Sequence, residues 1–215
     1  MKGSKPFKLR RWQIAPPANR FHSFFFTCAR PGRTGDPASK HAQVSENMVH
    51  RWVLGLPYPN TAIVSLLGRK PDGLSEFSFY SFYGGFDSPS EHPGRLSFQE
   101  WLDRWHGDLS IVVSQHATQD FEPIQHEMLD EIASDINKLL SAGRTVVVVD
   151  SGGQTRTGMV CRHMGAVEHT RKIGRKKIVL SVNIPARSVE SKFHKARGTG
   201  APSPPGGLPG LGKHQ

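Results

Sequence analysis

The chain has 215 residues, and 28 Lys and Arg against 18 Asp and Glu give it a net charge of +10 at neutral pH. Its two cysteines, Cys28 and Cys161, provide no disulfide framework and no metal-ligand spacing, which excludes a disulfide-stapled module and favours the reducing cytoplasm. The apolar run at residues 24–26 is too short to cross a bilayer, so we predict no transmembrane segment.

Charge is distributed unevenly along the chain. Residues 1–35 carry eight Lys or Arg and no acid, and residues 165–215 carry ten Lys or Arg against Glu168 and Glu190. The stretch between these flanks is therefore acidic. The basic flanks indicate either contact with a polyanion, such as RNA, a phosphoinositide headgroup or a phosphoprotein, or solvated tails that keep the protein soluble.

Composition divides the chain into three parts. Residues 1–44 are predicted to be a basic N-terminal extension, and residues 45–195 a single α/β domain that is long enough to bury a sizeable core. Residues 196–215 are rich in Gly and Pro and have almost nothing to bury, so we predict that they are disordered.

The first part of the predicted domain has the composition of β-structure. Residues 52–67 and 77–82 are expected to form strands, with a turn between them at residues 71–73. Large aromatic side chains are more often core residues than ligand platforms, so we expect a core position for Trp52, Trp101 and Trp105.

A helix and a short strand follow. Ser97 and Glu100 match the capping-box pattern in front of a stripe of apolar residues at helical spacing, which predicts a helix from Ser97 to about His106. Residues 111–114 are expected to form a short strand.

The second half alternates helix, strand and helix. Apolar residues at helical spacing predict a helix from His126 to Leu140, which Gly143 ends. The valine run at residues 146–149 predicts a strand buried on both faces, and a second helix is expected from Thr157 to about His169. Such alternation is typical of an α/β fold with a mainly parallel central sheet flanked by helices.

A glycine-rich turn follows the valine strand and ends in Arg156-Thr157-Gly158. Backbone amides of such a turn can converge on an anion, and the next helix adds its dipole. Arg156 would supply a planar fork for two phosphate oxygens. We therefore predict a phosphate-binding loop made of Ser151, Gly152, Gly153, Gln154, Thr155 and Arg156.

Residues 149–158 resemble the signature loop of the cysteine-dependent protein tyrosine and dual-specificity phosphatases, His-Cys-x-x-Gly-x-x-Arg-Ser/Thr-Gly. Gly153, Arg156 and the Thr157-Gly158 pair match that pattern. Val149 stands where the family has histidine, and Asp150 stands where it has the nucleophilic cysteine. The resemblance implies a dual-specificity-phosphatase-like sheet and a phosphorylated protein or another phosphate ester as ligand.

The segment upstream of the loop extends this resemblance. Residues 120–124 look like the short loop in which the family carries its general-acid aspartate, and a helix and the signature strand follow in the same order. The resemblance therefore implies that Asp120 is the acid. The candidate catalytic residues are Asp150, Asp120, Arg156 and Thr157.

Asp150 determines what chemistry the loop can perform. A thiolate is effective because its pKa is depressed and its sulfur is polarisable, whereas a carboxylate is a harder and weaker nucleophile. We favour a pseudophosphatase that retains the phosphate-binding loop and needs no cofactor. The first alternative is an active phosphohydrolase that forms an aspartyl-phosphate on Asp150, which would recruit Mg²⁺. The second is the phosphate turn of an actin-like kinase or ATPase fold, which the late position of the loop disfavours.

Structural roles compete with each of these assignments. Asp120 can serve as a turn residue, and Arg156 can tie the loop to Glu122 or Asp150. Cys161 is predicted to be a core residue. The histidines, including His163 and His169, have no spacing that makes a zinc site, so we predict structural or surface roles for them and no bound metal.

Overall fold

The computed structural model describes residues 9–14, 24–33, 44–57, 60–68, 96–120, 122–168, 170–173 and 176–179. The predictions at residues 71–73 and 77–82, the tail at 196–215 and much of the basic flanks lie outside these ranges. In the part of the chain that is described, no helix combines the length and the apolar character that crossing a membrane requires.

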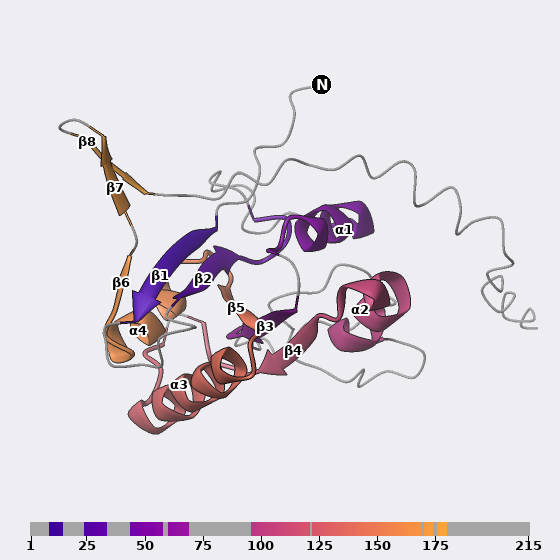
Figure 1. Cartoon of the computed structure of the whole chain (residues 1–215). Helices are drawn as coiled ribbons and strands as arrows, with labels where there is room; N and C mark the ends of the chain where they lie inside the picture. The colour runs from indigo at the N-terminus through magenta and orange to yellow at the C-terminus, as the bar shows by residue number, and fades with distance from the viewer. Residues whose placement is uncertain are drawn as a thin grey trace, which may run out of the picture. The chain divides into compact units, whose positions relative to one another are not determined.

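A six-stranded sheet organises the described residues, with the strand order β4-β3-β5-β2-β1-β6 (Figure 1). The strands are β1 (Arg10–Ile14), β2 (Phe24–Ala29), β3 (Thr61–Ser65), β4 (Val112–Gln115), β5 (Thr145–Asp150) and β6 (Ala166–Glu168). A separate antiparallel pair consists of β7 (Thr170–Ile173) and β8 (Lys176–Val179).

The sheet is mixed, so the expected α/β class is confirmed but the sheet is only partly parallel. Strands β2, β5, β3 and β4 are parallel neighbours. Strand β1 runs antiparallel to both β2 and β6. The antiparallel edge comes from segments that were not predicted as strands, because β1 lies in the presumed extension and β6 in the presumed last helix.

Helices cover both faces of the sheet. They are α1 (Glu46–Leu54), α2 (Phe98–His106), α3 (His126–Ser141) and α4 (Thr155–His163), and a short 3-10 turn, Gly107–Leu109, follows α2. The core cluster on one face contains side chains of α1 and α2, and the cluster on the other face contains side chains of α3 and α4. Along β5, Val147 and Val149 belong to the first cluster, whereas Val146 and Val148 belong to the second. The valine strand is therefore buried on both faces, as predicted.

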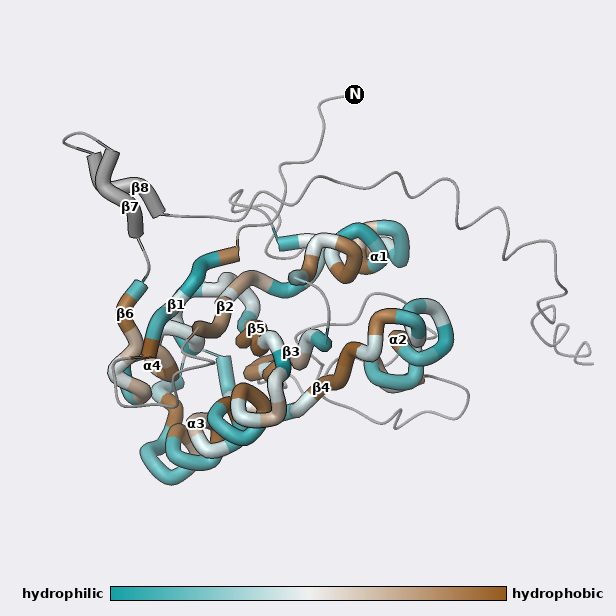
Figure 2. Tube along the Cα trace, viewed as in Figure 1, coloured by the Kyte–Doolittle hydropathy of each residue, from teal (hydrophilic) through white to brown (hydrophobic). Residues whose placement is uncertain are grey.

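The predicted helices agree with the sequence patterns that identified them. Helix α2 begins with a complete capping box, in which the Ser97 hydroxyl accepts from the Glu100 amide and the Glu100 carboxylate accepts from the Ser97 amide. Helix α3 ends just before Gly143, whose φ of 75° is in the left-handed region. Figure 2 shows alternating hydrophilic and hydrophobic segments along α3, as expected for a helix that buries one face.

Three element predictions were wrong. Residues 10–14 and 24–29, which were placed in an N-terminal extension, are strands of the central sheet, and β2 is the neighbour of β5. The start of the predicted strand at 52–67 is helical, because Val49, Trp52 and Val53 lie at helical spacing and are all buried. Helix α4 begins at Thr155 and ends at His163, since Gly165 takes a φ of 62° before β6.

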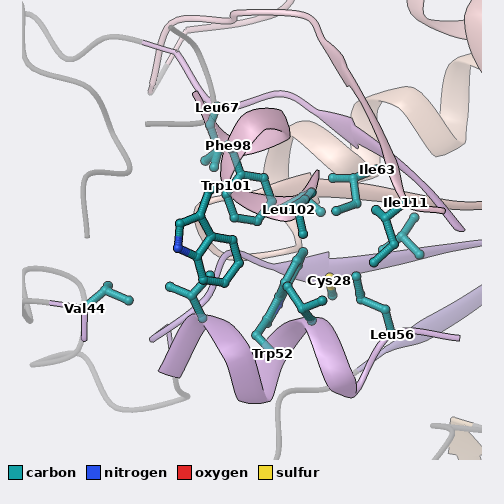
Figure 3. Close-up of a cluster of buried hydrophobic side chains, with 14 of the residues drawn as sticks. Cys28, Val44, Trp52, Leu56, Ile63, Leu67, Phe98, Trp101, Leu102 and Ile111 are labelled. Carbon is teal, nitrogen blue, oxygen red and sulfur yellow. The ribbon is translucent and has the colours of Figure 1, made fainter. Parts of the chain in front are cut away.

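Aromatic side chains hold α1 and α2 against the sheet (Figure 3). Trp52 donates a hydrogen bond to the carbonyl of Ala29 at 3.0 Å, and Phe98 stacks on Trp101 with ring centroids 5.7 Å apart. Trp52 and Trp101 are core residues as predicted. Trp105, in contrast, is exposed, so the prediction of a core position was wrong for this residue.

A buried pair of imidazoles joins the same two helices. Nδ1 of His50 lies 2.8 Å from Nε2 of His106, so one hydrogen is shared between the two rings. The Glu46 carboxylate lies 4.0 Å from the other nitrogen of His50 and accepts a hydrogen bond from Trp101. Burial lowers the pKa of His50, and the negative charge of Glu46 offsets part of that effect.

We expect this pair to make stability depend on pH. Because the pKa of His50 is lower in the folded protein, the unfolded chain binds the proton first, and the free energy of unfolding should decrease as the pH falls from about 7.5 to about 5.5. Urea denaturation at several pH values measures this slope. His50→Phe should flatten the slope, and His126→Gln, at an exposed imidazole, is the control. Equal slopes in the wild type and His50→Phe would contradict the prediction.

Candidate functional site

The site lies at the carboxyl ends of the parallel strands, where ligands usually bind in open α/β sheets. Strand β5 ends at Asp150, and the loop leads directly into α4. Backbone hydrogen bonds join the segments after β2 and β3 to the end of β5, and the segment after β4 to the end of β3. The Arg30 amide donates to the Asp150 carbonyl, the Leu66 amide donates to the Val149 carbonyl, and the His116 amide donates to the Ser65 carbonyl.

Asp150 points into the loop and not toward solvent. Asp150 is buried, with only 2% of its surface exposed. One carboxylate oxygen accepts a hydrogen bond from the Gly153 amide, and the other accepts from the Thr157 amide at 2.9 Å. The carboxylate therefore ties the loop to the first turn of α4 and lies at the positive end of that helix.

Gly153 allows the loop to press against β2. Its φ is 69°, and a Cβ built on it would lie 2.4 Å from the Ala29 nitrogen and 2.5 Å from the Cys28 carbonyl carbon. Both atoms are backbone atoms in the middle of the sheet, so they cannot move aside cheaply. Only glycine fits this position, and this explains why the centre of the loop is a glycine.

Arg156 is buried and contacts the neighbouring segments. Nη1 donates to the Leu66 carbonyl at 3.0 Å and lies 3.3 Å from both the carbonyl and the hydroxyl of Thr118. Nη2 lies 3.4 Å from an oxygen of Asp120. The guanidinium thus joins the loops that follow β3, β4 and β5. This ion pair ties Arg156 to Asp120.

The exposed rim of the loop consists of backbone amides and small polar side chains. Gly152, Gln154 and Thr155 are exposed and Ser151 is half-buried. Among the described residues, no acceptor is found for the amides of Ser151, Gly152, Gln154 and Thr155. This rim can donate hydrogen bonds to an anion, although the carboxylate of Asp150 already occupies the inner side of the loop.

Thr157 contributes its amide but leaves its hydroxyl without a partner among the described residues. Its Oγ is buried, while its backbone donates to Asp150. Buried hydroxyls are normally hydrogen-bonded, so the unused hydroxyl marks a polar position beside the Asp150 carboxylate.

Neither cysteine supplies a thiolate to the site. Cys28 lies on β2 beside β5, where burial raises the pKa of its thiol and the charge of Asp150 raises it further. Burial raises the pKa of Cys161 to about 12. Both thiols are therefore protonated at neutral pH, and Cys161 is the core residue that was predicted.

The structure brings Asp150, Gly153, Arg156, Thr157 and Asp120 together, although Asp120 is about thirty residues upstream of the loop. Sequence reasoning missed the carbonyl of Leu66, both polar atoms of Thr118 and the close approach of β2. A backbone carbonyl leaves no signal in a sequence, and the contact with β2 depends on a long-range strand pairing.

Comparisons with family models, curated proteins and solved structures found no match to this chain.

Proposed function

We propose that this protein is a phosphatase-like protein without hydrolytic activity, in which Asp150 replaces the nucleophile and holds the phosphate-binding loop in shape. One observation carries this proposal. The two oxygens of the Asp150 carboxylate accept hydrogen bonds from the Gly153 amide in the loop and the Thr157 amide in the first turn of α4, at a residue that is 2% exposed. The loop is suited to binding an anion from solution, and the Asp150 carboxylate is an anion of the protein itself that already accepts hydrogen bonds there.

The same geometry argues against attack by Asp150 on phosphorus. An attacking oxygen must direct a lone pair at the phosphorus atom from about 3 Å away. Each oxygen of Asp150 instead faces a backbone amide, and leaving this position would cost two hydrogen bonds to a charged group. A carboxylate in this position stabilises the loop better than it serves as a nucleophile.

The ligand that we propose is a phosphate monoester on a protein, bound at the exposed rim of the loop. The amides of Ser151, Gly152, Gln154 and Thr155 would donate to its oxygens. The negative charge of Asp150 opposes a phosphate dianion, since at a separation of about 4 Å the repulsion is about 4 kcal/mol for each pair of unit charges near a protein surface. We therefore infer that the natural sequence binds phosphate esters weakly and that the charge of Asp150 limits the affinity.

The test compares the wild type with Asp150→Asn, which removes the charge and keeps the size of the side chain. Isothermal titration with phenyl phosphate should show at least about tenfold tighter binding to Asp150→Asn, which corresponds to about 1.4 kcal/mol. Asp108→Asn, in the 3-10 turn after α2, is the matched control and should bind as the wild type does. Equal affinities in all three proteins, or no binding by any of them, would refute the phosphate-binding part of the proposal.

Hydrolysis of p-nitrophenyl phosphate tests the loss of activity. The wild type should show no turnover with or without Mg²⁺, whereas Asp150→Cys should gain activity if the scaffold is otherwise intact. Turnover in the wild type that disappears in Asp150→Asn would overturn the proposal.

The second candidate is a carboxylate-based phosphohydrolase, and the position of Asp120 favours it. The predicted general acid lies 3.4 Å from Arg156 at the edge of the loop, and its side chain is 23% exposed. A carboxyl group at the edge of the loop is where a leaving-group protonation step would need its general acid. This candidate requires a hydroxylamine-labile phosphoryl adduct on Asp150 under saturating substrate, and the absence of that adduct would exclude it.

A further inference from the structure

We propose that His126, Asp130 and His163 form a binding site for a divalent transition-metal ion of the zinc class on the surface where α3 and α4 meet. His126 is the first residue of α3, and Asp130 follows one turn later on the same face of that helix. His163 is the last residue of α4. The two helices contribute side chains to one core cluster, which packs them against each other.

The ligand atoms are already close to the separations that a metal ion requires. Nε2 of His163 lies 2.8 Å from one oxygen of Asp130, and Nδ1 of His126 lies 3.6 Å from the other oxygen. One ligand atom from each of the three residues can be chosen so that all lie within 4.8 Å of one another. Around a tetrahedral ion with bonds of about 2.1 Å, ligand atoms lie roughly 3.4 Å apart. Small rotations of the side chains therefore complete the geometry.

The side chains are accessible and partly oriented before an ion arrives. The side chains of His126 and Asp130 are 74% and 66% exposed, and that of His163 is 20% exposed. The hydrogen bond between His163 and Asp130 holds both groups at the site, and a metal ion would replace the hydrogen between them. The rings of His126 and His163 meet edge to face, with centroids 5.0 Å apart.

Two imidazoles and one carboxylate determine which ions fit. Zinc-class ions accept nitrogen and oxygen ligands in tetrahedral sites, and three protein ligands leave a fourth position for water. Mg²⁺ and Ca²⁺ prefer six or more oxygen ligands, so they should bind poorly. The negative end of the α4 dipole lies at His163 and favours a cation, whereas the positive end of the α3 dipole lies at His126 and opposes one, so the affinity must come from the three ligands themselves.

This site is separate from the loop at Asp150. His163 and Thr155 are at opposite ends of α4, about 12 Å apart along the helix axis. An ion bound here would join the start of α3 to the end of α4 and stabilise the helix that carries Arg156 and Thr157. The proposed metal site does not depend on the proposed function. The hydrolysis assay with Mg²⁺ does not test the metal site.

The test uses the full chain without an affinity tag. Co²⁺ titration followed by visible absorption should give the bands of a tetrahedral complex at one equivalent, and Zn²⁺ should displace Co²⁺. Zn²⁺ should also raise the Tm, whereas the same concentration of Mg²⁺ should not. His126→Gln, Asp130→Asn and His163→Gln should each weaken Co²⁺ binding by about tenfold or more.

The control variant is Glu131→Gln, which removes an exposed acid next to Asp130 without removing a ligand. It should bind Co²⁺ as the wild type does. The chain has eleven histidines, and Co²⁺ bound only at other histidines would give the same affinity in the wild type and in all three ligand variants. That result, or the absence of a tetrahedral spectrum in the wild type, would overturn the proposal.

Discussion

Gly153→Ala is expected to destabilise the protein by about 3 to 5 kcal/mol, because two separate costs add at this residue. The first cost is the left-handed backbone, with φ at 69°. The second is the collision of the new Cβ with backbone atoms of Ala29 and Cys28 at 2.4 and 2.5 Å, which would push the loop away from β2. Urea denaturation measures the change, and a decrease in Tm of about 10 °C is expected for a chain of this size.

The neighbouring glycine is the matched control for this prediction. A Cβ on Gly152 would meet no atom within 4 Å, and its φ is not in the strained region. Gly152→Ala should therefore change the free energy of unfolding by less than about 1 kcal/mol. If both variants lost the same stability, the contact between the loop and β2 would not be the reason that glycine is needed.

Asp150→Ala should destabilise the protein by about 3 kcal/mol or more. The substitution removes the acceptor for the amides of Gly153 and Thr157, and a hydrogen bond to a charged group contributes about 1.5 to 3 kcal/mol. It also removes a negative charge from the positive end of α4. Chemical denaturation of the wild type and the variant measures the loss.

A small effect at this position would contradict the structural role that we assign to Asp150. Asp108→Asn again provides the comparison, since this acid is exposed and belongs to the 3-10 turn after α2 and not to the loop. The control should lose less than about 0.5 kcal/mol. A nucleophilic aspartate is usually a destabilised group, so a variant at Asp150 that is more stable than the wild type would favour the catalytic alternative.

Both predictions describe a loop that the protein holds in place by itself. Gly153 and Asp150 fix its backbone against β2 and α4, and Arg156 joins it to the loops that follow β3 and β4. The loop therefore has its shape without a ligand.

Local patterns in the sequence predicted several elements correctly. The capping box at Ser97, the apolar stripe of α3 and the valine run of β5 each carry a signal within a few residues. The glycine and arginine of the loop were identified in the same way. The physical reason is that caps, helical faces and buried strands are determined by neighbours along the chain.

The tertiary structure decided what depends on residues far apart in the sequence. The place of β1 and β2 in the sheet follows from long-range strand pairing. The basic composition of residues 1–35 indicated a terminal extension instead, so these strands were not predicted. The carbonyl of Leu66 and the residue Thr118 reach Arg156 only because parallel strands end at the same edge. The sequence by itself determined that a carboxylate stands between the valine strand and the glycine-rich loop. Only the fold decided that this carboxylate accepts the amides of Gly153 and Thr157, because their positions depend on how the loop packs against β2 and on where α4 begins.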